Sequence, residues 1–352
     1  MKFWRNVYVV RVADEGKFLK QCGAKVIKKN YLCANFLNKK NMRIGLIDVD
    51  YFGKFPNLAL MKISAFHKNN GDEVEWYFPF AQRYDKVYIS KVFSFTRDYQ
   101  EVINADEVVR GGSGYAIKLV DGREVWSENA EFQQHLPDEI EHIYPDYSLY
   151  PQLTKKKAFG FLSRGCPRGC EFCHVAKKEG KCSKKVADLS EFWRNQKEIV
   201  LLDPNITACA ERFELLQQLA DSRALVDFTQ GIDMRMMTSD LSRIFAKIRK
   251  KRVHFAWDRI GDEDALMNGL EKWKTHNTIG DQKLICFVLT NFDTTFEQDL
   301  HRLTILRKMK IQPYVMVYNK LNANSRYKEL QNWCNDPRIW AKCENFDKYK
   351  KF

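Results

Sequence analysis

Three cysteines stand close together near the middle of the 352-residue chain, and their thiols are the groups best suited to chemistry. Cys166, Cys170 and Cys173 follow a Cys-x3-Cys-x2-Cys spacing in a segment that also holds two glycines and a proline. Such a loop can bring three thiolates onto one cluster. A 4Fe-4S cluster normally takes four cysteine ligands, so three leave one iron open to a group that is not protein. The spacing therefore predicts a 4Fe-4S cluster with one reactive iron.

The same segment allows a different metal site. His174 follows Cys173 directly, so three thiolates and one imidazole could hold a structural zinc ion. Adjacent residues chelate one tetrahedral ion awkwardly, which favours the cluster. The other cysteines lack Cys-x2-Cys pairing and are expected to be ordinary thiols, two of them in the N-terminal segment: Cys22, Cys33, Cys182, Cys209, Cys286, Cys334 and Cys343.

Composition narrows the class of protein. Ten cysteines are too sparse for a disulfide scaffold, and without an export signal they favour the cytoplasm. No apolar stretch approaches the roughly 18 residues of a membrane span, so no membrane partner is expected. The net charge is +13, but residues 1–41 contribute +8 and leave +5 for residues 42–352. A nucleic-acid partner is therefore an open alternative and not the favoured one.

The first group of elements precedes the cysteines. Residues 1–41 show no regular pattern and are interpreted as a basic N-terminal extension. Residues 42–125 predict a small Rossmann-like parallel sheet with one helix from about Pro56 to Asn69. Residues 126–156 are rich in charge, proline and tyrosine and are interpreted as a linker. The strands expected in this group are Ile44–Asp48, Glu73–Tyr77, Lys86–Ser90 and Glu107–Arg110.

The second group, residues 157–320, predicts an α/β fold of the TIM type with six units, a partial (β/α)6 barrel. Its strands recur with room for one helix between neighbours. Because loops meet at the carboxyl ends of such strands, the site is expected there. Residues 321–352 are interpreted as a C-terminal tail. The expected strands are Ala158–Ser163, Glu198–Leu202, Leu225–Thr229, Val253–Trp257, Leu284–Thr290 and Pro313–Tyr318.

The cysteine loop after the first barrel strand resembles the hallmark of the radical S-adenosylmethionine (radical SAM) superfamily. Phe172 stands where that superfamily places an aromatic residue before the last cysteine. The resemblance implies that the open iron binds S-adenosylmethionine and that the reduced cluster cleaves it to a 5'-deoxyadenosyl radical, which abstracts hydrogen from a substrate. It also implies a reductant such as flavodoxin or ferredoxin. Neither the substrate nor a catalytic residue is identified.

Polar residues at two strand ends are candidates for holding S-adenosylmethionine, by their position in the family. Asp203 and Asn205 stand where many relatives have Gly-Gly-Glu, which is a departure from the pattern. Gln230, Asp233 and Arg235 end the third strand, and Arg235 could pair with the cofactor carboxylate. The plainer alternatives are helix caps at the second strand and a surface ion pair between Asp233 and Arg235.

Two later strand ends could line a substrate pocket. These are Trp257–Arg259 after the fourth strand and Asn291–Thr295 after the fifth. Asp293 and Thr294 could equally cap the helix that is expected near Phe296.

The first group of elements resembles the cobalamin-binding-type domain that precedes the barrel in one branch of the superfamily. The resemblance rests on Phe55–Leu58 and Val108–Gly112, and it implies ligand loops at residues 50–57 and 111–114. The segment is shorter than such domains and lacks an Asp-x-His-x-x-Gly motif. A domain that has kept only its fold is therefore favoured over one that binds cobalamin.

Three functions remain open. The first is a radical SAM enzyme with an unidentified substrate, which would be a cobalamin-dependent radical methyltransferase if cobalamin binds. The second is a tRNA-modifying, methylthiotransferase-like enzyme, for which a second cysteine triplet and a basic RNA-binding module are expected and neither is evident. The third is a zinc-stabilised binding protein without catalysis.

Overall fold

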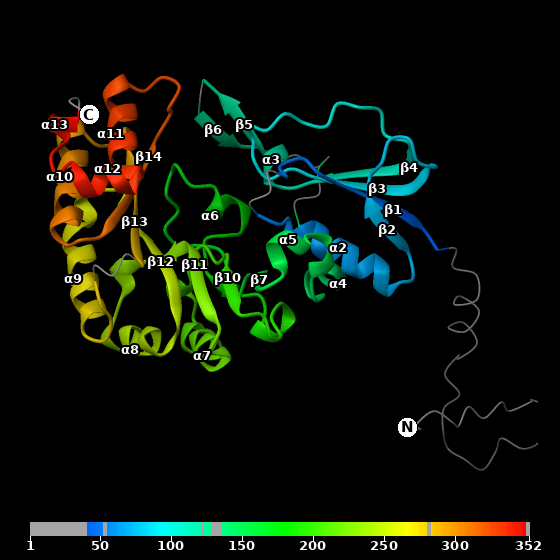
Figure 1. The fold of residues 1–352 in the computed structure, drawn as a ribbon, viewed down its shortest axis with the longest axis horizontal. Helices are drawn as coiled ribbons and strands as arrows, with labels where there is room; N and C mark the ends of the chain where they lie inside the picture. The colour runs from blue at the N-terminus through cyan, green and yellow to red at the C-terminus, as the bar shows by residue number, and fades with distance from the viewer. Residues whose placement is uncertain are drawn as a thin grey trace, which may run out of the picture. The chain divides into compact units, whose positions relative to one another are not determined.

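The computed structural model describes residues 41–51, 55–121, 123–127, 132, 135–279 and 283–349. These residues form a mixed α/β structure with two separate parallel sheets, one of four strands and one of six, and two short antiparallel hairpins (Figure 1). The predicted α/β class is confirmed. The predicted basic extension, with Cys22 and Cys33, lies outside the described residues except for Asn41.

The first sheet has the strand order β2-β1-β3-β4, and all its pairs are parallel. Its central strand β1 buries Ile44 and Leu46 in one cluster and Ile47 in another, as expected of a parallel strand that is covered on both faces. Helix α2 (Leu58–Asn69) begins two residues later than the predicted Pro56, since the Asn57 side chain caps it by accepting from the Leu60 N–H. The four predicted strands are confirmed to within two residues: β1 (Arg43–Asp48), β2 (Glu73–Trp76), β3 (Tyr84–Ser90) and β4 (Ala105–Gly111).

The segment between the two sheets packs on both of them. Tyr150 is buried, and its hydroxyl donates to the Asp48 carboxylate at the end of β1, at 2.6 Å. The Tyr147 hydroxyl donates to the Phe192 carbonyl beside the second sheet, at 2.6 Å. Two tyrosines near the C-terminal end of the segment predicted as a linker therefore bind it to both sheets. The predicted linker, residues 126–156, contains α4 (Asp138–Glu141), the 3-10 helix η1 (Tyr147–Leu149) and α5 (Pro151–Thr154). Before it lie α3 (Ser113–Ala116) and the hairpin of β5 (Ile117–Val120) and β6 (Arg123–Trp126).

The second sheet keeps its strands in chain order, β7-β10-β11-β12-β13-β14, and all pairs are parallel. All six predicted strands are present. The first ends at Gly160 rather than Ser163, because the chain turns away there into the cysteine loop. The strands are β7 (Lys157–Gly160), β10 (Glu198–Leu201), β11 (Leu225–Ile232), β12 (Lys250–Ala256), β13 (Leu284–Thr290) and β14 (Gln312–Val317).

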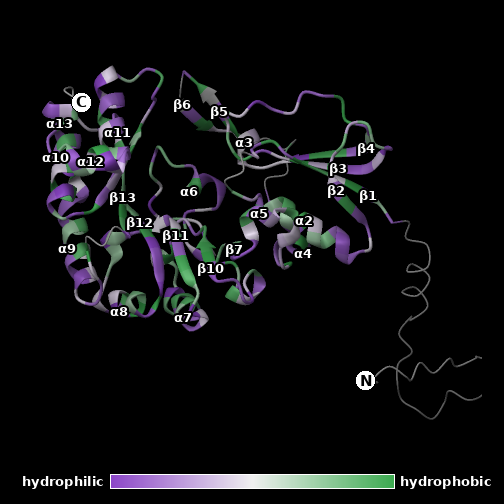
Figure 2. Cartoon of the chain, in the orientation of Figure 1, coloured by the Kyte–Doolittle hydropathy of each residue, from purple (hydrophilic) through white to green (hydrophobic). Residues whose placement is uncertain are grey.

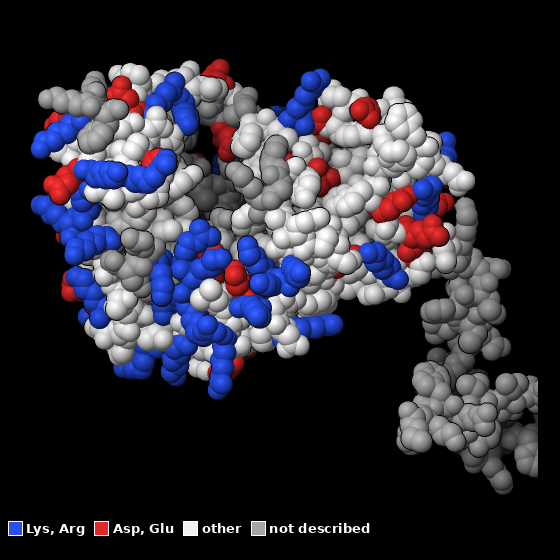
Figure 3. Space-filling model, in the orientation of Figure 1, with Lys and Arg blue, Asp and Glu red and all other residues white. Residues whose placement is uncertain are grey.

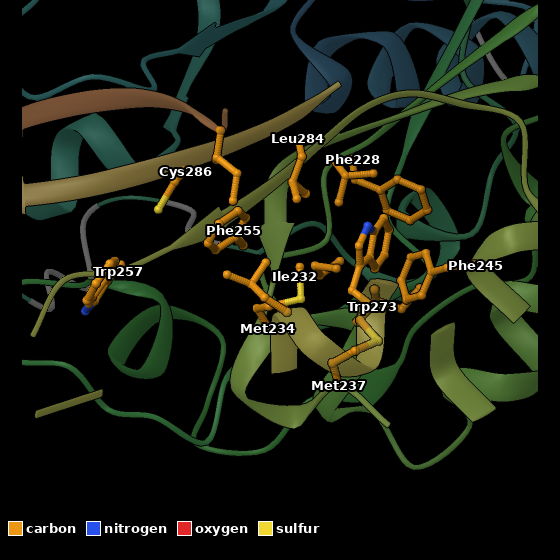
Figure 4. Close-up of a cluster of buried hydrophobic side chains, with 14 of the residues drawn as sticks. Phe228, Ile232, Met234, Met237, Phe245, Phe255, Trp257, Trp273, Leu284 and Cys286 are labelled. Atoms are coloured by element: carbon orange, nitrogen blue, oxygen red, sulfur yellow. The ribbon is translucent and has the colours of Figure 1, made fainter. Parts of the chain in front are cut away.

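Helices cover one face of this sheet, and the largest hydrophobic core lies between the two layers (Figure 4). Phe228 on the sheet packs against Phe245 on a helix, and Phe245 in turn packs against Trp273 on the next helix. Figure 2 shows β10 and β11 as largely hydrophobic strands. The connecting helices are α7 (Arg212–Ser222), α8 (Ser239–Lys247), α9 (Glu263–Lys274) and α10 (Phe296–Lys308), with the 3-10 helices η2 (Leu189–Glu191), η3 (Ile206–Ala208), η4 (Met234–Met236) and η5 (Ile260–Asp262).

The residues predicted as a C-terminal tail complete this core as far as the structure describes them. They form α11 (Ser325–Asn335), α12 (Pro337–Lys342) and α13 (Phe346–Tyr349). Trp333 and Trp340 are buried and pack against each other with ring centres 4.8 Å apart. Among the described residues, no helix has the length and apolar character needed to cross a membrane.

The other face of the six-stranded sheet carries aromatic side chains. His254 on β12 stacks on Phe287 of β13, with ring centres 5.0 Å apart. Tyr314 on β14 packs edge-on against Phe287 and is about half exposed. This face therefore offers a surface of rings next to the carboxyl ends of the strands.

Candidate functional site

The cysteine loop lies at the carboxyl end of β7, and hydrogen bonds close its base. β8 (Ser163–Arg164) pairs antiparallel with β9 (Lys184–Lys185), and between them the loop forms one helical turn, α6 (Val175–Lys178). The Cys166 N–H donates to the Gly180 carbonyl at 3.1 Å. Gly165 has φ +88°, and a Cβ there would lie 2.2 Å from the Cys182 carbonyl oxygen. Only glycine fits this close approach, so the turn before the first cysteine is fixed by the sequence.

The three predicted thiols are neighbours within this loop. Cys166, Cys170 and Cys173 are all free and partly buried, and the Cys173 N–H donates to the Cys170 carbonyl at 3.0 Å in a tight turn. Burial raises the pKa of Cys170 and of Cys173, and the other thiols of the triplet add to both shifts.

The donor chemistry of the triplet fits an iron–sulfur cluster, because three thiols on one short loop match the ligands that such clusters take. The three side chains are not arranged as a complete metal site, however. In the part of the chain that the structure describes, no group of three or more His, Cys, Asp or Glu side chains is arranged to hold a metal ion.

Asp203, at the end of β10, is directed at the start of the cysteine loop. Its buried carboxylate accepts from the Leu162 N–H at 2.8 Å, from the Ser163 N–H, and from the Ser163 hydroxyl at 2.6 Å. Burial raises the pKa of Asp203 to about 7, although these donors oppose the shift. Asp203 thus fixes the backbone that leads into the loop.

Asn205 is the polar residue of β10 that reaches the cysteines. Its Nδ2 lies 3.5 Å from the Cys166 sulfur, and its Oδ1 accepts from the Thr207 hydroxyl at 2.7 Å. The Ser183 hydroxyl also donates to the Asn205 carbonyl, at 2.9 Å. These bonds hold the amide with its N–H groups toward the thiol. Of the two candidates at this strand end, one contacts the triplet and the other supports the loop.

Asp233 links the cysteine loop to the end of β11. Its buried carboxylate accepts from Arg168 of the loop at 2.5 Å and from Arg235 at 2.7 Å. Burial alone would raise the pKa of Asp233, but the hydrogen bonds and charges of these two arginines outweigh it and lower the pKa. Arg235 also pairs with Asp262. The predicted Asp233–Arg235 pair is therefore present, but it is buried and joined to the loop.

Gln230 stands apart from this network. It is exposed on β11, where the pairing with β12 shifts register between Phe228 and Ile232. Gly231 has φ +106° in this irregular stretch, and a Cβ there would lie 2.9 Å from the His254 carbonyl oxygen. The bulge turns Asp233 toward the loop and leaves Gln230 on the surface.

Two side-chain contacts, one between aromatic rings and one between an imidazole and a carboxylate, connect the cysteine loop to distant parts of the chain. Phe172 packs edge-on against Phe292 at the end of β13, with ring centres 5.2 Å apart. His174 faces Glu124 of β6, with its Nε2 3.4 Å from the carboxylate. Sequence reasoning missed Arg168 and Glu124, because only the path of the loop brings them to their partners. The one signal for Arg168 is its charge inside the motif.

The end of β12 contributes a buried carboxylate. Burial raises the pKa of Asp258, which accepts from the Leu289 N–H at 3.1 Å and acts electrostatically on Cys170. At the end of β13 the helix cap is Thr295, which shares a capping box with Gln298. The expectation that Asp293 or Thr294 caps this helix is wrong, because α10 begins at Phe296 and its cap is the residue directly before it.

The carboxyl end of the first sheet is filled by its own side chains. Asp48 is bound by Tyr150, and burial raises its pKa. Gly112 has φ +104°, and a Cβ there would lie 2.2 Å from the Lys91 carbonyl oxygen. The predicted ligand loop at residues 111–114 is thus packed on Lys91. The other predicted ligand loop, residues 50–57, lies partly outside the described residues.

Compared with known proteins, the chain matches no protein-family model, and no curated protein matches it significantly.

Proposed function

We propose that this chain is a radical SAM enzyme that holds a 4Fe-4S cluster on Cys166, Cys170 and Cys173. One observation carries the proposal. The three free thiols lie in one loop after the first strand of a parallel sheet whose six strands follow chain order. This strand order would suit the proposed partial (β/α)6 barrel, preceded by the proposed small Rossmann-like domain. The loop would then lie at the carboxyl ends of the strands, where barrel enzymes place their sites.

The residues around the triplet support distinct roles. When bound, the cluster would supply an electron that splits S-adenosylmethionine and so starts hydrogen abstraction. Asn205 directs an amide N–H at the Cys166 sulfur, and donors to sulfur tune such clusters. Asp203 holds the backbone before the loop, which makes it a positioning residue rather than a ligand.

Asp233 and its two arginines fix the other side of the loop. Because Arg168 and Arg235 share the Asp233 carboxylate, the loop is tied to the end of β11 close to where the cofactor would bind. Arg235 reaches a cofactor carboxylate only by giving up part of its pairing with Asp233 and Asp262. Phe172, packed on Phe292, helps to exclude water from the triplet.

The alternatives have less support. A zinc site needs His174 as its fourth ligand, and the adjacent residues Cys173 and His174 would chelate one tetrahedral ion awkwardly. A methylthiotransferase-like enzyme needs a second cysteine triplet, and residues 42–156 contain no cysteine. Cobalamin binding is disfavoured because Lys91 packs directly against the Gly111–Gly114 segment, where the ligand loop was predicted. The enzyme would need a separate reductant such as a flavodoxin or ferredoxin.

The test begins with anaerobic reconstitution of the full chain with iron and sulfide. We expect about four irons per chain and, after dithionite reduction with S-adenosylmethionine, formation of 5'-deoxyadenosine. Cys170→Ala should lose both. Cys182→Ala is the matched control, because Cys182 is an exposed thiol at the base of the same loop and should keep both. A colourless protein that binds one zinc ion and forms no product would contradict the proposal.

A further inference from the structure

Positive charge gathers at the amino ends of the strands in the six-stranded sheet, opposite the cysteine loop. Five stretches lead into β7, β10, β11, β12 and β13, and together they hold fourteen Lys and Arg against two acidic residues: 155–157, 194–198, 222–225, 247–252 and 272–284. The rest of residues 42–352 contains 34 Lys and Arg against 41 Asp and Glu. The charge is thus segregated, and Figure 3 shows the basic side chains concentrated near α7 and α8.

Two adjoining grooves run along this basic edge. One encloses about 460 Å³ and is lined by Arg249, Lys250 and Asn277 among others. The second encloses about 560 Å³ and is lined by Lys197 and Arg223 among others. Both are lined by Arg249 and by Leu225, so the two grooves adjoin at these residues and are together called the channel.

Several cations of this channel are not neutralised by the protein. Lys251 pairs with Glu198, and Arg252 pairs with Asp227. By contrast, within the described residues Lys197, Arg223 and Arg249 form no ion pair with a carboxylate, and all three are exposed. Arg249 donates only to the Arg223 carbonyl, at 2.9 Å. Exposed unpaired cations held side by side repel one another unless a polyanion binds them.

We propose that this channel binds the phosphodiester backbone of a nucleic acid. Regularly spaced phosphates suit unpaired Lys and Arg side chains along a groove. The groove walls also carry amide side chains and the ring of Trp193, which can contact bases. Nearby, Arg194 stacks on Tyr144 at 4.0 Å, a second flat surface beside the channel. The inference goes beyond the proposed enzyme function and does not depend on it, because no cysteine lines the channel.

The test is a binding titration of the full chain by fluorescence anisotropy. The probes are labelled 20-nucleotide single-stranded RNA, single-stranded DNA and duplex RNA. Comparing their affinities shows which kind of nucleic acid binds best. In the triple variant Lys197→Gln, Arg223→Gln and Arg249→Gln we expect about tenfold or greater loss of affinity at 100 mM KCl. Its slope of log affinity against log salt should fall by about 2, near 0.7 for each lost phosphate contact to a single strand.

The control triple variant removes the same charge elsewhere, through Arg97→Gln, Lys118→Gln and Lys328→Gln, three exposed residues outside the basic edge. It should bind like the unaltered chain, and so should the Cys166, Cys170 and Cys173 to Ala variant, whose cluster chemistry is lost. Equal weakening by both charge variants would overturn the inference, as would tighter binding of a labelled polyglutamate peptide than of any nucleic acid. Absence of binding at 50 mM KCl would overturn it as well.

Discussion

The two parallel sheets end in different ways at their carboxyl edges. In the first sheet Asp48 accepts the Tyr150 hydroxyl, and the glycine segment after β4 packs on Lys91. In the second sheet Asp203 and Asp233 bind the two sides of a long loop that carries three free thiols. One edge is filled by its own side chains, and the other holds a loop that presents reactive groups.

The difference indicates that carboxylates at strand ends hold neighbouring segments in place, and that their hydrogen-bond partners determine how much of the chain is held. Asp203 binds two backbone N–H groups and a hydroxyl at the start of the loop, and Asp233 binds a loop arginine. Asp48 binds the Tyr150 hydroxyl and a neighbouring backbone N–H, that of Asp50, so it fixes one distant side chain. The anchoring should therefore decrease in the order Asp203, Asp233, Asp48. Removing each partner in turn tests this order.

The largest effect is expected from Asp203→Ala. It leaves two buried N–H groups and one hydroxyl without their acceptor, so the free energy of unfolding should fall by about 3–5 kcal/mol. Urea unfolding measures this loss. Asp221→Ala, an exposed residue near the end of α7, is the control and should change stability by less than about 0.5 kcal/mol. A similar loss in both variants would mean that Asp203 is no anchor.

The pH dependence of stability sharpens the same point. The pKa of Asp203 is about 7 in the folded chain, above its ordinary value, so the folded state holds this proton more tightly than the unfolded state. The protonated Asp203 side chain therefore contributes its full stabilisation below about pH 4. This contribution to the free energy of unfolding decreases by up to roughly 4 kcal/mol as the pH rises to about 7. Asp203→Asn does not titrate. The stability of the unaltered chain relative to this variant should therefore fall between pH 4 and 8, and a constant difference would contradict the raised pKa.

Asp233→Asn should have a smaller effect on stability and a clear effect on the loop. The buried carboxylate pairs with Arg168 and Arg235, so its neutralisation should cost about 2 kcal/mol. With the loop less restrained, iodoacetamide should alkylate Cys170 faster, with exposed Cys182 as the internal reference. Asp240→Asn breaks an exposed pair with Arg243 and should leave both measurements unchanged. Equal alkylation rates in the two variants would show that Asp233 does not restrain the loop.

Much of the fold follows from local sequence patterns. Strands such as β1 and β13 are short apolar runs, so their positions could be predicted without tertiary contacts. The boundaries were less predictable, because they depend on side chains such as Asn57, which caps α2, and Asp203, which draws the chain away after Gly160. The helices after Asn319 went unrecognised, since their buried tryptophans are separated by polar residues.

The site was predictable only where the signal is local. The spacing of the cysteines indicates a shared loop, but the sequence cannot tell whether a carboxylate at a strand end faces a ligand or a backbone N–H. Asp203 was for this reason predicted as a cofactor contact. The Arg168–Asp233 pair joins residues 65 positions apart, and the basic edge combines five separate stretches. Such features arise only when the strands are assembled side by side.

At the first sheet, Tyr150→Phe should lower the free energy of unfolding least among these variants. It removes one hydroxyl that donates to Asp48 at 2.6 Å while the buried ring keeps its packing, so the loss should be about 1–2 kcal/mol. Tyr314→Phe is the matched control, because that tyrosine is about half exposed, and it should cost close to nothing. Urea unfolding of both variants gives the numbers. If Tyr150→Phe destabilised the chain as much as Asp203→Ala, a single hydroxyl would anchor as strongly as a network of backbone bonds, and the proposed order of the two edges would be wrong.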